Sequence, residues 1–387
     1  MEEWKECKLS DICDYGKDRI EVSSLDNSTY ISTENMLPNR AGVTTATTLP
    51  TGEYTPSFEI DDTLVSNIRP YFKKIWKATF SGGCSADVLV FKAKENISKD
   101  YLYYVLADDE FFKYSMATSK GTKMPRGDKT SIMNYPVKLP PLPTQQKIAA
   151  ILSSLDYKIE LNNKINTNLE QQAQALFKNW FVAFEPFSGK MPEGWKVGKL
   201  SEIADYLNGL AMQKFRPLEG EEGLPVLKIK ELRQGCYDES SELCSPSRIK
   251  PEYIIHDGDV IFSWSGSLLV DIWCGGTCGL NQHLFKVTSK TYEKWFYYLW
   301  TKHHLDRFIF LAADKATTMG HIKREELDKA EVVIPDDKTY SKLTMTLSPI
   351  IDTIINNRVE NRRLSEIRDN LLPELMSGNI NVEDITI

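Results

Sequence analysis

The chain has 387 residues, 41% of them hydrophobic and 26% charged, which is the balance of a soluble globular protein with room for two or three domains. No apolar run approaches the roughly 18 residues of a membrane-spanning helix, and the acidic, polar first residues lack the features of a signal peptide, so the expected location is the cytoplasm. The net charge of −7 counts against a protein that binds nucleic acid by itself, but not against one that presents its basic residues on a single face or works inside a larger complex.

The seven cysteines predict reduced, partly buried thiols, because their number is odd and no Cys-x-x-Cys pair occurs. Cys274 and Cys278 are four residues apart and His283 follows nearby. A structural zinc site uses four close ligands, and only two or three are in reach here. No metal site is therefore expected.

An internal repeat begins at Trp4. The stretch Trp4–Tyr15 returns as Trp195–Tyr206, with eight of twelve residues identical at an offset of 191. Further matches follow in the same order at offsets up to 196, and they pair Phe58–Val65 with Ile254–Ile261, Gly82–Lys92 with Gly276–Lys286, Tyr101–Leu106 with Trp295–Trp300, and Thr122–Met124 with Thr317–Met319. An ordered series at a nearly constant offset indicates a tandem duplication.

Each copy of the repeat has a globular part and a helical part. Residues 1–143 and 187–338 mix short β-branched runs with Gly, Pro and Asn breaks and one aromatic helix, which predicts an α/β or α+β domain. Residues 144–186 and 339–387 show helical periodicity instead. Proline marks the start of both helical parts, as expected where an extended segment ends.

The helical parts carry an apolar seam in alternating steps of four and three residues. The seam runs from Ile148 to Trp180 and returns from Leu343 to Leu375 at an offset of 195, with two asparagines at the same places. A seam of this length is typical of a coiled coil, here about 50 Å long.

An antiparallel pairing of the two helices would give a compact monomer with internal pseudo-two-fold symmetry. It sets Asn162 against Asn361, and Asn166 against Asn357, so that paired amides satisfy each other and a slipped register leaves them facing leucine. The alternative is two surface helices that pack only on their own domains.

A globular domain, a long helix, a second globular domain and a second long helix resemble the specificity subunit of Type I restriction–modification systems over essentially the whole chain. The most specific marks are the twice-used phrase Trp-Lys-x-x-Lys-Leu-Ser-Asp/Glu-Ile and the stretch Leu139–Ile148 (Leu-Pro-Pro-Leu-Pro-Thr-Gln-Gln-Lys-Ile). The second helix lacks this Pro-x-x-x-Gln-Gln lead, and the first domain lacks the Met191–Gly194 lead of the second.

The resemblance implies two target-recognition domains in tandem, each reading one half of a bipartite site in double-stranded DNA. It also implies that the helices form an antiparallel spacer to which two modification (methyltransferase) subunits dock, with restriction subunits joining the complex. S-adenosylmethionine, ATP and Mg²⁺ would then be bound by partner subunits and not by this chain.

In the first domain, two basic segments are expected to contact DNA. The segment Ser66–Lys77 has four basic residues and no acid, and Ser119–Lys129 is broken by Gly and Pro. Amide and guanidinium groups can read base edges, and lysines can fix phosphates. Asn67 and Arg69 are the first choices for base contact, and the other candidates are Lys73, Lys74, Lys77, Lys120, Thr122, Lys123 and Arg126.

In the second domain the matching segments differ, as they must if the two halves read different sequences. Trp264 could stack on bases or wedge between them, and the amides of Asn281 and Gln282 suit adenine. The full set of candidates is Lys228, Lys230, Ser263, Trp264, Ser265, Asn281, Gln282, His283, Lys315, Thr317, Thr318, His321 and Lys323. For each residue alone, a solvated surface side chain is the competing interpretation.

No motif for catalysis is expected in this chain. A phosphate-binding Gly-x-x-x-x-Gly-Lys-Ser/Thr loop, a Gly-x-Gly-x-x-Gly motif and an Asn/Asp-Pro-Pro-Tyr/Phe motif are all missing from the sequence. Two other functions stay open: a specificity module of a related Type II or phage-exclusion methylation system, and a two-headed scaffold that binds proteins through its helices and no DNA.

Overall fold

The computed structural model describes residues 4–238, 240–314 and 322–382. It divides into two compact units, of which unit 1 is Met1–Tyr157 with Leu364–Ile387 and unit 2 is Lys158–Arg363. Both boundaries fall inside long helices, α5 (Leu142–Phe181) and α11 (Asp337–Ser377). Each unit therefore combines a globular part, called here the first head (residues 4–139) or the second head (residues 195–334), with one segment of each helix.

The first head contains two four-stranded sheets, in the orders β2-β9-β6-β7 and β3-β5-β8-β4, and a two-stranded β1-β10 ribbon. Its strands are β1 Lys5–Lys8, β2 Cys13–Tyr15, β3 Arg19–Glu21, β4 Tyr30–Ile31, β5 Tyr54–Phe58, β6 Thr63–Ser66, β7 Ile75–Lys77, β8 Gly82–Cys84, β9 Val88–Ala93 and β10 Pro136–Leu139. Its helices are α1 Leu9–Ile12, α2 Lys99–Ala107, α3 Asp109–Ala117 and α4 Lys129–Ile132.

The second head repeats this plan, with sheets β12-β19-β16-β17 and β14-β13-β18-β15 and a β11-β20 ribbon. Its strands are β11 Lys196–Lys199, β12 Asp205–Asn208, β13 Leu224–Leu227, β14 Leu243–Cys244, β15 Ile254–Ile255, β16 Val260–Ser263, β17 Leu269–Ile272, β18 Cys278–Leu280, β19 Leu284–Thr288 and β20 Glu331–Ile334. Its helices are α6 Leu200–Ile203, α7 Ile229–Gln234, α8 Lys294–His303, α9 Leu305–Asp314 and α10 Glu325–Asp328.

The aromatic helix of each repeat supplies the core between its head and the long helices. Tyr104 in α2 is 3% exposed, and Tyr298 in α8 is 4% exposed. The α5 residues Ile148 and Leu152 join the core of the first head, and Phe177 joins that of the second. Burial of large aromatic side chains against a helix is the main apolar contribution here.

Strand pairing corrects the alignment of the two repeats. Tyr15 pairs with Phe91, whereas Tyr206 pairs with Val287, so the offset in β9 and β19 is 196. The sequence match of Phe91 with Phe285 was wrong by two residues, an error that keeps every side chain on its own face of the strand and so leaves no trace in the hydrophobic pattern.

The heads differ at the outer strand of the sheet that contains β8 in the first head and β18 in the second, called here the smaller sheet because its four strands contain fewer residues. In the first head β3 pairs with β5, and in the second head β14 pairs with β13. The central strands β8 and β18 occupy the same place in the two sheets. The smaller sheet is thus extended at opposite edges in the two heads, which share their inner strands.

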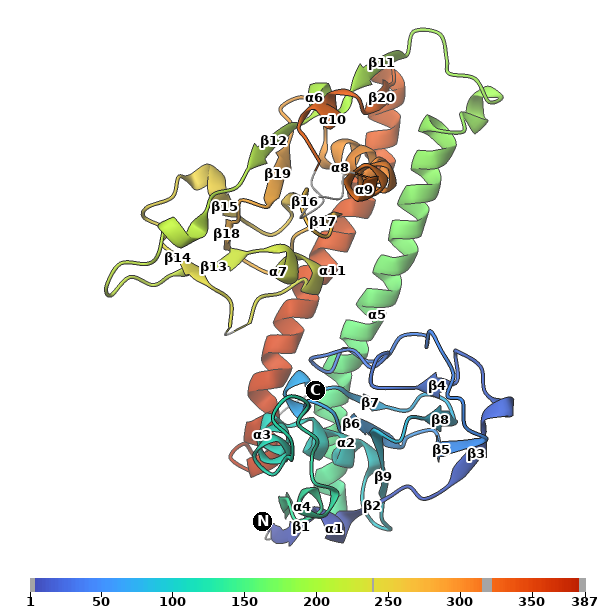
Figure 1. Ribbon diagram of the computed structural model, residues 1–387, viewed down its shortest axis with the longest axis vertical. Helices are drawn as coiled ribbons and strands as arrows, with labels where there is room; N and C mark the ends of the chain where they lie inside the picture. The colour runs from blue at the N-terminus through green and yellow to red at the C-terminus, as the bar shows by residue number, and fades with distance from the viewer. Residues whose placement is uncertain (1–3, 239, 315–321, 383–387) are drawn as a thin grey trace. The chain divides into compact units, whose positions relative to one another are not determined.

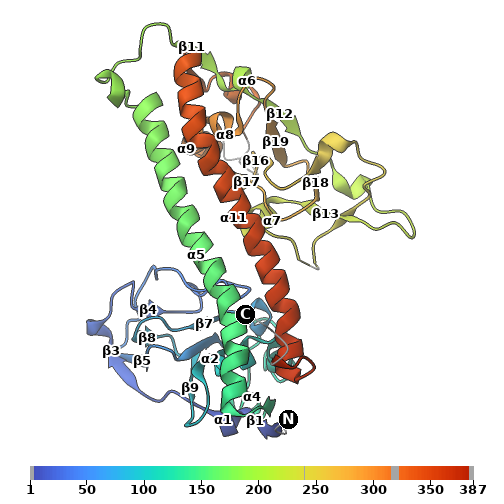
Figure 2. The same ribbon diagram turned by 180° about the vertical axis from the view of Figure 1, so that it is seen from behind.

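The two long helices contact each other within each unit and lie side by side in Figures 1 and 2. In unit 2, Asn162 Nδ2 donates to Asn361 Oδ1 (2.8 Å) and Asn357 Nδ2 donates to Asn166 Oδ1 (2.9 Å). Because the partner's number falls as the residue number rises, the paired segments are antiparallel. The asparagine contacts expected from the sequence are present.

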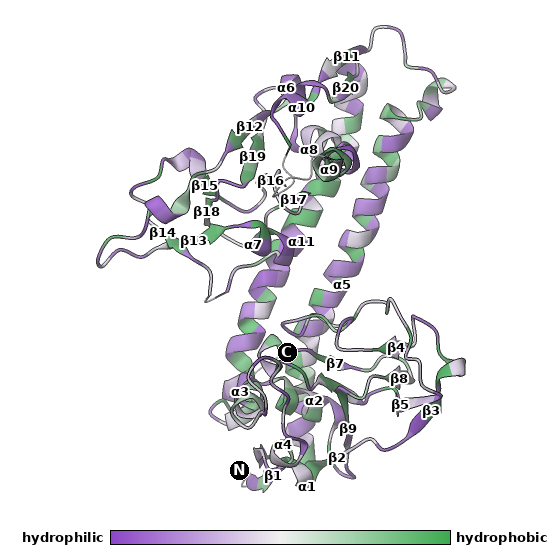
Figure 3. Cartoon of the chain, in the orientation of Figure 1, coloured by the Kyte–Doolittle hydropathy of each residue, from purple (hydrophilic) through white to green (hydrophobic). Residues whose placement is uncertain are grey.

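Hydrophobic and hydrophilic residues are interspersed along both helices in Figure 3. Within the described ranges, no helix is long and apolar enough to cross a membrane.

Candidate nucleic-acid interface

Three loops of the first head are joined by backbone hydrogen bonds at one end of β6. Asn67 N–H donates to the Asp87 carbonyl (2.8 Å), and Gly127 N–H donates to the Asn67 carbonyl (3.2 Å). Lys120 N–H donates to the Arg126 carbonyl (2.9 Å), and Arg126 N–H donates to the Lys120 carbonyl (3.0 Å). The two basic segments predicted separately from the sequence therefore meet at one place.

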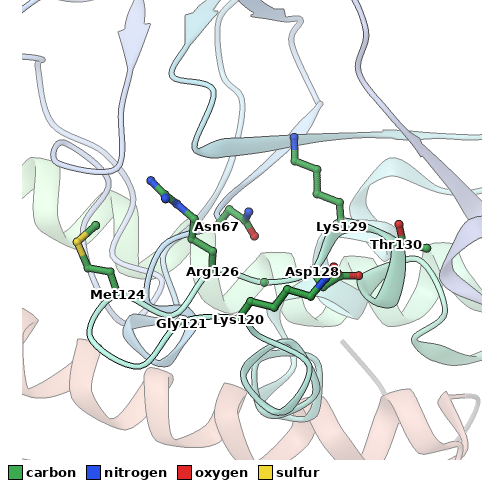
Figure 4. Close-up of a pocket in the computed structure, with 9 residues that line it drawn as sticks. Asn67, Lys120, Gly121, Met124, Arg126, Asp128, Lys129 and Thr130 are labelled. Carbon is green, nitrogen blue, oxygen red and sulfur yellow. Dashed lines mark hydrogen bonds and ion pairs between the residues drawn. The ribbon is translucent and has the colours of Figure 1, made fainter.

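The joined loops surround an open cavity of about 580 Å³ (Figure 4). Asn67 lines it and is 7% exposed, and its Oδ1 accepts no hydrogen bond from the described residues. A buried carbonyl oxygen without a donor costs free energy, and functional sites are one place where that cost persists. The amide of Asn67 is thus available to an incoming donor.

Three exposed cations, Lys120, Arg126 and Lys129, line the same cavity. The Lys120 side chain is 81% exposed and pairs with Asp128 at 2.6 Å, and the Arg126 side chain is 53% exposed and pairs with Asp87 at 3.2 Å. The hydrogen bonds from Lys120 and Ser131 lower the pKa of Asp128 to about 2. Thr122 and Lys123 lie exposed in the same loop. Surface ion pairs of this kind are weak and can exchange partners.

A neighbouring cavity of about 570 Å³ shares Met124 and Arg126 with the first and is lined also by Arg69. Arg69 has a left-handed backbone (φ 51°), and its Nε is buried without a partner among the described residues. Its N–H donates to the Pro125 carbonyl (2.8 Å), which fixes the loop to its neighbour.

The three lysines that follow in the first segment make contacts inside the head. Lys73 pairs with Asp109 (2.7 Å), and Lys77 pairs with Asp100 and with Asp61 (3.1 Å). Burial opposes the charge of Lys77, but these carboxylates outweigh it and its pKa lies above the usual value. Lys74 donates to the Thr33 carbonyl, and burial lowers its pKa. These three ammonium groups therefore already have partners within the head, which reduces their availability for contacts with DNA phosphates.

The second head repeats the backbone links with different side chains. Trp264 N–H donates to the His283 carbonyl (3.4 Å), and Ile322 N–H donates to the Trp264 carbonyl (3.2 Å). These bonds put Trp264 in the place of Asn67, and His283 in the place of Asp87. The Trp264 ring is half-buried against Phe285, and its Nε1 donates to Asn208 Oδ1 (3.0 Å).

A cavity of about 470 Å³ in the second head brings together five of its thirteen predicted residues, since it is lined by Lys228, Lys230, Asn281, Gln282 and His283, with Gln213, Ile229 and Glu242. The carboxylates of Glu242 and Asp238 pair with Lys228 (2.8 Å) and Lys230 (2.9 Å) respectively. Sequence reasoning missed Gln213, which carries no local signal because it lies far along the chain from the other lining residues.

The serines of the Ser263–Ser267 turn shape the loop. Ser263 is fully buried and its Oγ donates to the Ser267 carbonyl (2.8 Å), while Ser265 Oγ lies 3.0 Å from His283 Nδ1. Lys323 is exposed. The candidates Lys315, Thr317, Thr318 and His321 lie outside the described residues.

The two cysteines considered for a metal are buried thiols. Burial raises the pKa of Cys274 to about 11 and that of Cys278 to about 12. Within the part of the chain that the structure describes, no group of three or more His, Cys, Asp or Glu side chains could hold a metal ion.

Comparison with known proteins gives one consistent family. The family described as Type I restriction modification DNA specificity domain matches residues 1–171 and 192–367. The chain is 28% identical to the Type I restriction enzyme MjaIX specificity subunit of Methanocaldococcus jannaschii, over 76% of this chain and 71% of that protein. It is 24% identical to the Type I restriction enzyme HindI specificity subunit of Haemophilus influenzae, over 98% of this chain and 100% of that protein.

A solved structure shows the same fold. The crystal structure of the S subunit of a Type I restriction–modification system from M. genitalium matches with a TM-score of 0.56 and 14% sequence identity, over 97% of this chain and 96% of that chain.

Proposed function

Because the chain belongs to the family of Type I restriction modification DNA specificity domains, we propose that each of its heads reads one half of a bipartite DNA target for a Type I restriction–modification complex. The observation that carries this proposal is the repeated loop framework. The same backbone links hold Asn67 beside Asp87 in the first head and Trp264 beside His283 in the second. A constant framework with different side chains suits two heads that read different half-sites.

In the first head, Lys120, Lys123 and Arg126 would contact phosphates and the Asn67 amide would contact a base edge. The three cations are exposed, and Asn67 Oδ1 accepts no hydrogen bond from any residue that the structure describes, which supports this division. An orphan acceptor gains a hydrogen bond from an exocyclic amino group of adenine or cytosine. Lys73, Lys74 and Lys77 would add positive potential rather than direct contacts.

In the second head, Asn281, Gln282 and His283 would read bases, with Lys228, Lys230 and Lys323 on phosphates and Trp264 supporting the loop. The convergence of the first five on one cavity supports this assignment. Lys315, Thr317, Thr318 and His321 would contact DNA as well.

The helices α5 and α11 would form an antiparallel coiled-coil spacer with internal pseudo-two-fold symmetry. The hydrogen bonds among Asn162, Asn166, Asn357 and Asn361 support it, because buried amide pairs fix the register of two helices. Two modification subunits would dock to this spacer, with restriction subunits beyond them.

The chain itself would carry no catalytic centre, and S-adenosylmethionine, ATP and Mg²⁺ would be bound by the partner subunits. Its net charge of −7 fits a protein that depends on partners for most of its DNA affinity.

Mapping of methylated bases in cells that express the chain with its modification subunits tests this function. The expected result is one motif of two half-sites separated by a fixed gap. The purified chain alone should bind duplex DNA weakly, with affinity that falls steeply with salt, and should transfer no methyl group. Methylation that does not change when this chain is deleted would contradict the proposal.

A further inference from the structure

The second head is tied to α11 by two arginines one helical turn apart. Arg358 and Arg362 project from α11, and β17 lies beside this helix in Figure 1. Their side chains are 26% and 27% exposed, so most of each is covered by the head.

Arg358 links three elements at once. Its Nη1 donates to Asp271 Oδ1 (2.9 Å) and to the Ile272 carbonyl (3.0 Å) in β17, and its Nη2 donates to Glu170 Oε1 (2.8 Å) in α5. A planar guanidinium with all its partners fixed holds them in one relative orientation.

Arg362 makes a two-pronged contact with the head. Its Nη1 and Nη2 donate to the two carboxylate oxygens of Asp257 at 2.7 and 2.8 Å, and Nη1 also donates to the Cys274 carbonyl at 2.7 Å. Gly276 N–H donates to the same carboxylate (2.8 Å). Gly276 has φ +93°, and a Cβ there would lie 3.3 Å from Arg362 Nη1, so the turn needs glycine to approach the arginine.

The duplication does not supply this clamp to the first head. At the helix offset of 195, Arg358 and Arg362 correspond to Asn163 and Thr167 of α5. In unit 1 the polar contact between head and helices is made by Asp156 of α5, whose carboxylate accepts hydrogen bonds from Tyr104 of the head (2.7 Å) and from Arg368 of α11 (2.7 Å). Each head therefore sits on the helices through a shared apolar core and through its own polar contacts.

We propose that Arg358 and Arg362 are positioning residues that set the angle at which the second head is held on α11, and so the gap length at which its half-site is accepted. The proposal rests on the function proposed above. Apolar packing between α11 and the head is non-directional, whereas the forked bonds of Arg362 and the three-way bonds of Arg358 fix direction. A change of one base pair in the gap moves a half-site by about 3.4 Å and turns it by about a tenth of a helical turn, so a rigid head rejects the wrong gap.

Methylome mapping of cells that express the complex with Arg358→Met and Arg362→Met together tests the clamp. Met keeps much of the apolar stem and removes the directional bonds. We expect unchanged half-sites, with methylation at gaps one base pair longer or shorter rising about tenfold relative to the wild-type gap, a factor equal to 1.4 kcal/mol of discrimination. Arg362→Lys, which keeps the charge and loses the fork, should give a smaller rise.

Arg363→Met is the matched control, because it removes the same charge from an exposed position next to Arg362. It should leave the gap preference unchanged. A double variant that assembles with its modification subunits but keeps the single wild-type gap, or that loses methylation equally at all gaps, overturns the proposal. If the wild-type chain directs no bipartite methylation, the function proposed above fails instead. Thermal unfolding of the purified complexes separates a misfolded variant from an informative one.

Discussion

Asn67 is the residue at which stability and recognition conflict most clearly. Its amide lies at the meeting point of three loops, 7% exposed, and its Oδ1 has no donor among the described residues. Gly127 packs so close that a Cβ there would lie 2.8 Å from this oxygen. An apolar side chain would suit the unbound fold at least as well, and the unsatisfied oxygen supports the base contact proposed above for this asparagine.

We therefore expect Asn67→Ala to weaken DNA binding without much loss of stability. In the assembled complex the affinity for the cognate site should fall by about 1–3 kcal/mol, and the loss should depend on one base pair of one half-site. The free energy of unfolding should change by less than about 1 kcal/mol, because no hydrogen bond is lost. Lys73→Ala is the comparison: because Lys73 pairs with Asp109 and would add only positive potential, its loss should weaken binding to all sequences alike. An equal loss on random sequences would show that Asn67 does not read a base.

Glycine is required at the centre of the smaller sheet in both heads. A Cβ on Gly83 would lie 2.4 Å from Leu25 Cδ1, and a Cβ on Gly279, at the equivalent place, would lie 2.4 Å from Cys244 Sγ. We expect Gly83→Ala and Gly279→Ala each to lower the free energy of unfolding by about 1–3 kcal/mol through overpacking. Urea denaturation measures this, with Gly52→Ala as the control, since a Cβ there meets nothing closer than 3.7 Å. Equal free energies of unfolding for Gly83→Ala and Gly52→Ala would contradict the expectation that the sheet has no room for a Cβ at Gly83.

At the level of the element, long-range periodicity allowed more to be predicted than local composition. The apolar seam repeated at an offset of 195 predicted both helices and the contact of Asn162 with Asn361. A long seam allows this because a shift in register would misplace every later apolar residue, so only one pairing fits the whole pattern. The internal ion pairs of Lys73 and Lys77 could not be predicted, since Asp109 and Asp100 lie 36 and 23 residues away on other elements. The exchange of the outer strand, β3 against β14, also has no signal in segments this short.

The asparagine layer between α5 and α11 is expected to fix register at a cost in stability. Asn162 is 1% exposed and donates to both Glu360 (2.7 Å) and Asn361 (2.8 Å). Replacing Asn162, Asn166, Asn357 and Asn361 together by Leu should raise the melting temperature, because paired apolar side chains avoid the desolvation of amides. The distribution of distances between spin labels placed on the two helices should then become broader, because several registers are populated. A variant with a lower melting temperature and unchanged label distances would contradict this.

At the level of the whole molecule, the negative net charge and the basic loops are compatible because many cations are already paired with acids inside each unit. Lys73, Lys77, Arg358 and Arg368 all contact carboxylates. The cations at the cavities, such as Lys120, have weaker exposed pairs that DNA phosphates can replace. The loops can thus present exposed cations while the overall charge stays at −7, which fits the proposal that binding depends on both heads and the partner subunits.

If α5 and α11 act as a spacer, their length should set the gap in the target. The first head packs on Ile148 and Leu152 and bonds through Gln145, so added residues must lie beyond these contacts. Four residues inserted after Tyr157 and four after Arg363 fall at the unit boundary in both helices. A four-residue insertion is accommodated by local unwinding of a coiled coil. It adds about 6 Å at 1.5 Å per residue, which corresponds to one or two base pairs at about 3.4 Å each.

We expect the lengthened chain to direct methylation to the same two half-sites across a gap one or two base pairs wider, because the reading loops are untouched. Methylome mapping measures both the half-sites and the gap. The same four residues placed after Gly189, in the loop between α5 and the second head, are the control and should leave the gap as it was. Insertion in only one helix would offset the two helices on one side of the unit boundary, either at the Asn162–Asn361 contact or at the Asp156–Arg368 pair, and should reduce methylation at every gap. Altered half-sites, or full activity at the original gap, would show that the helices do not measure the target.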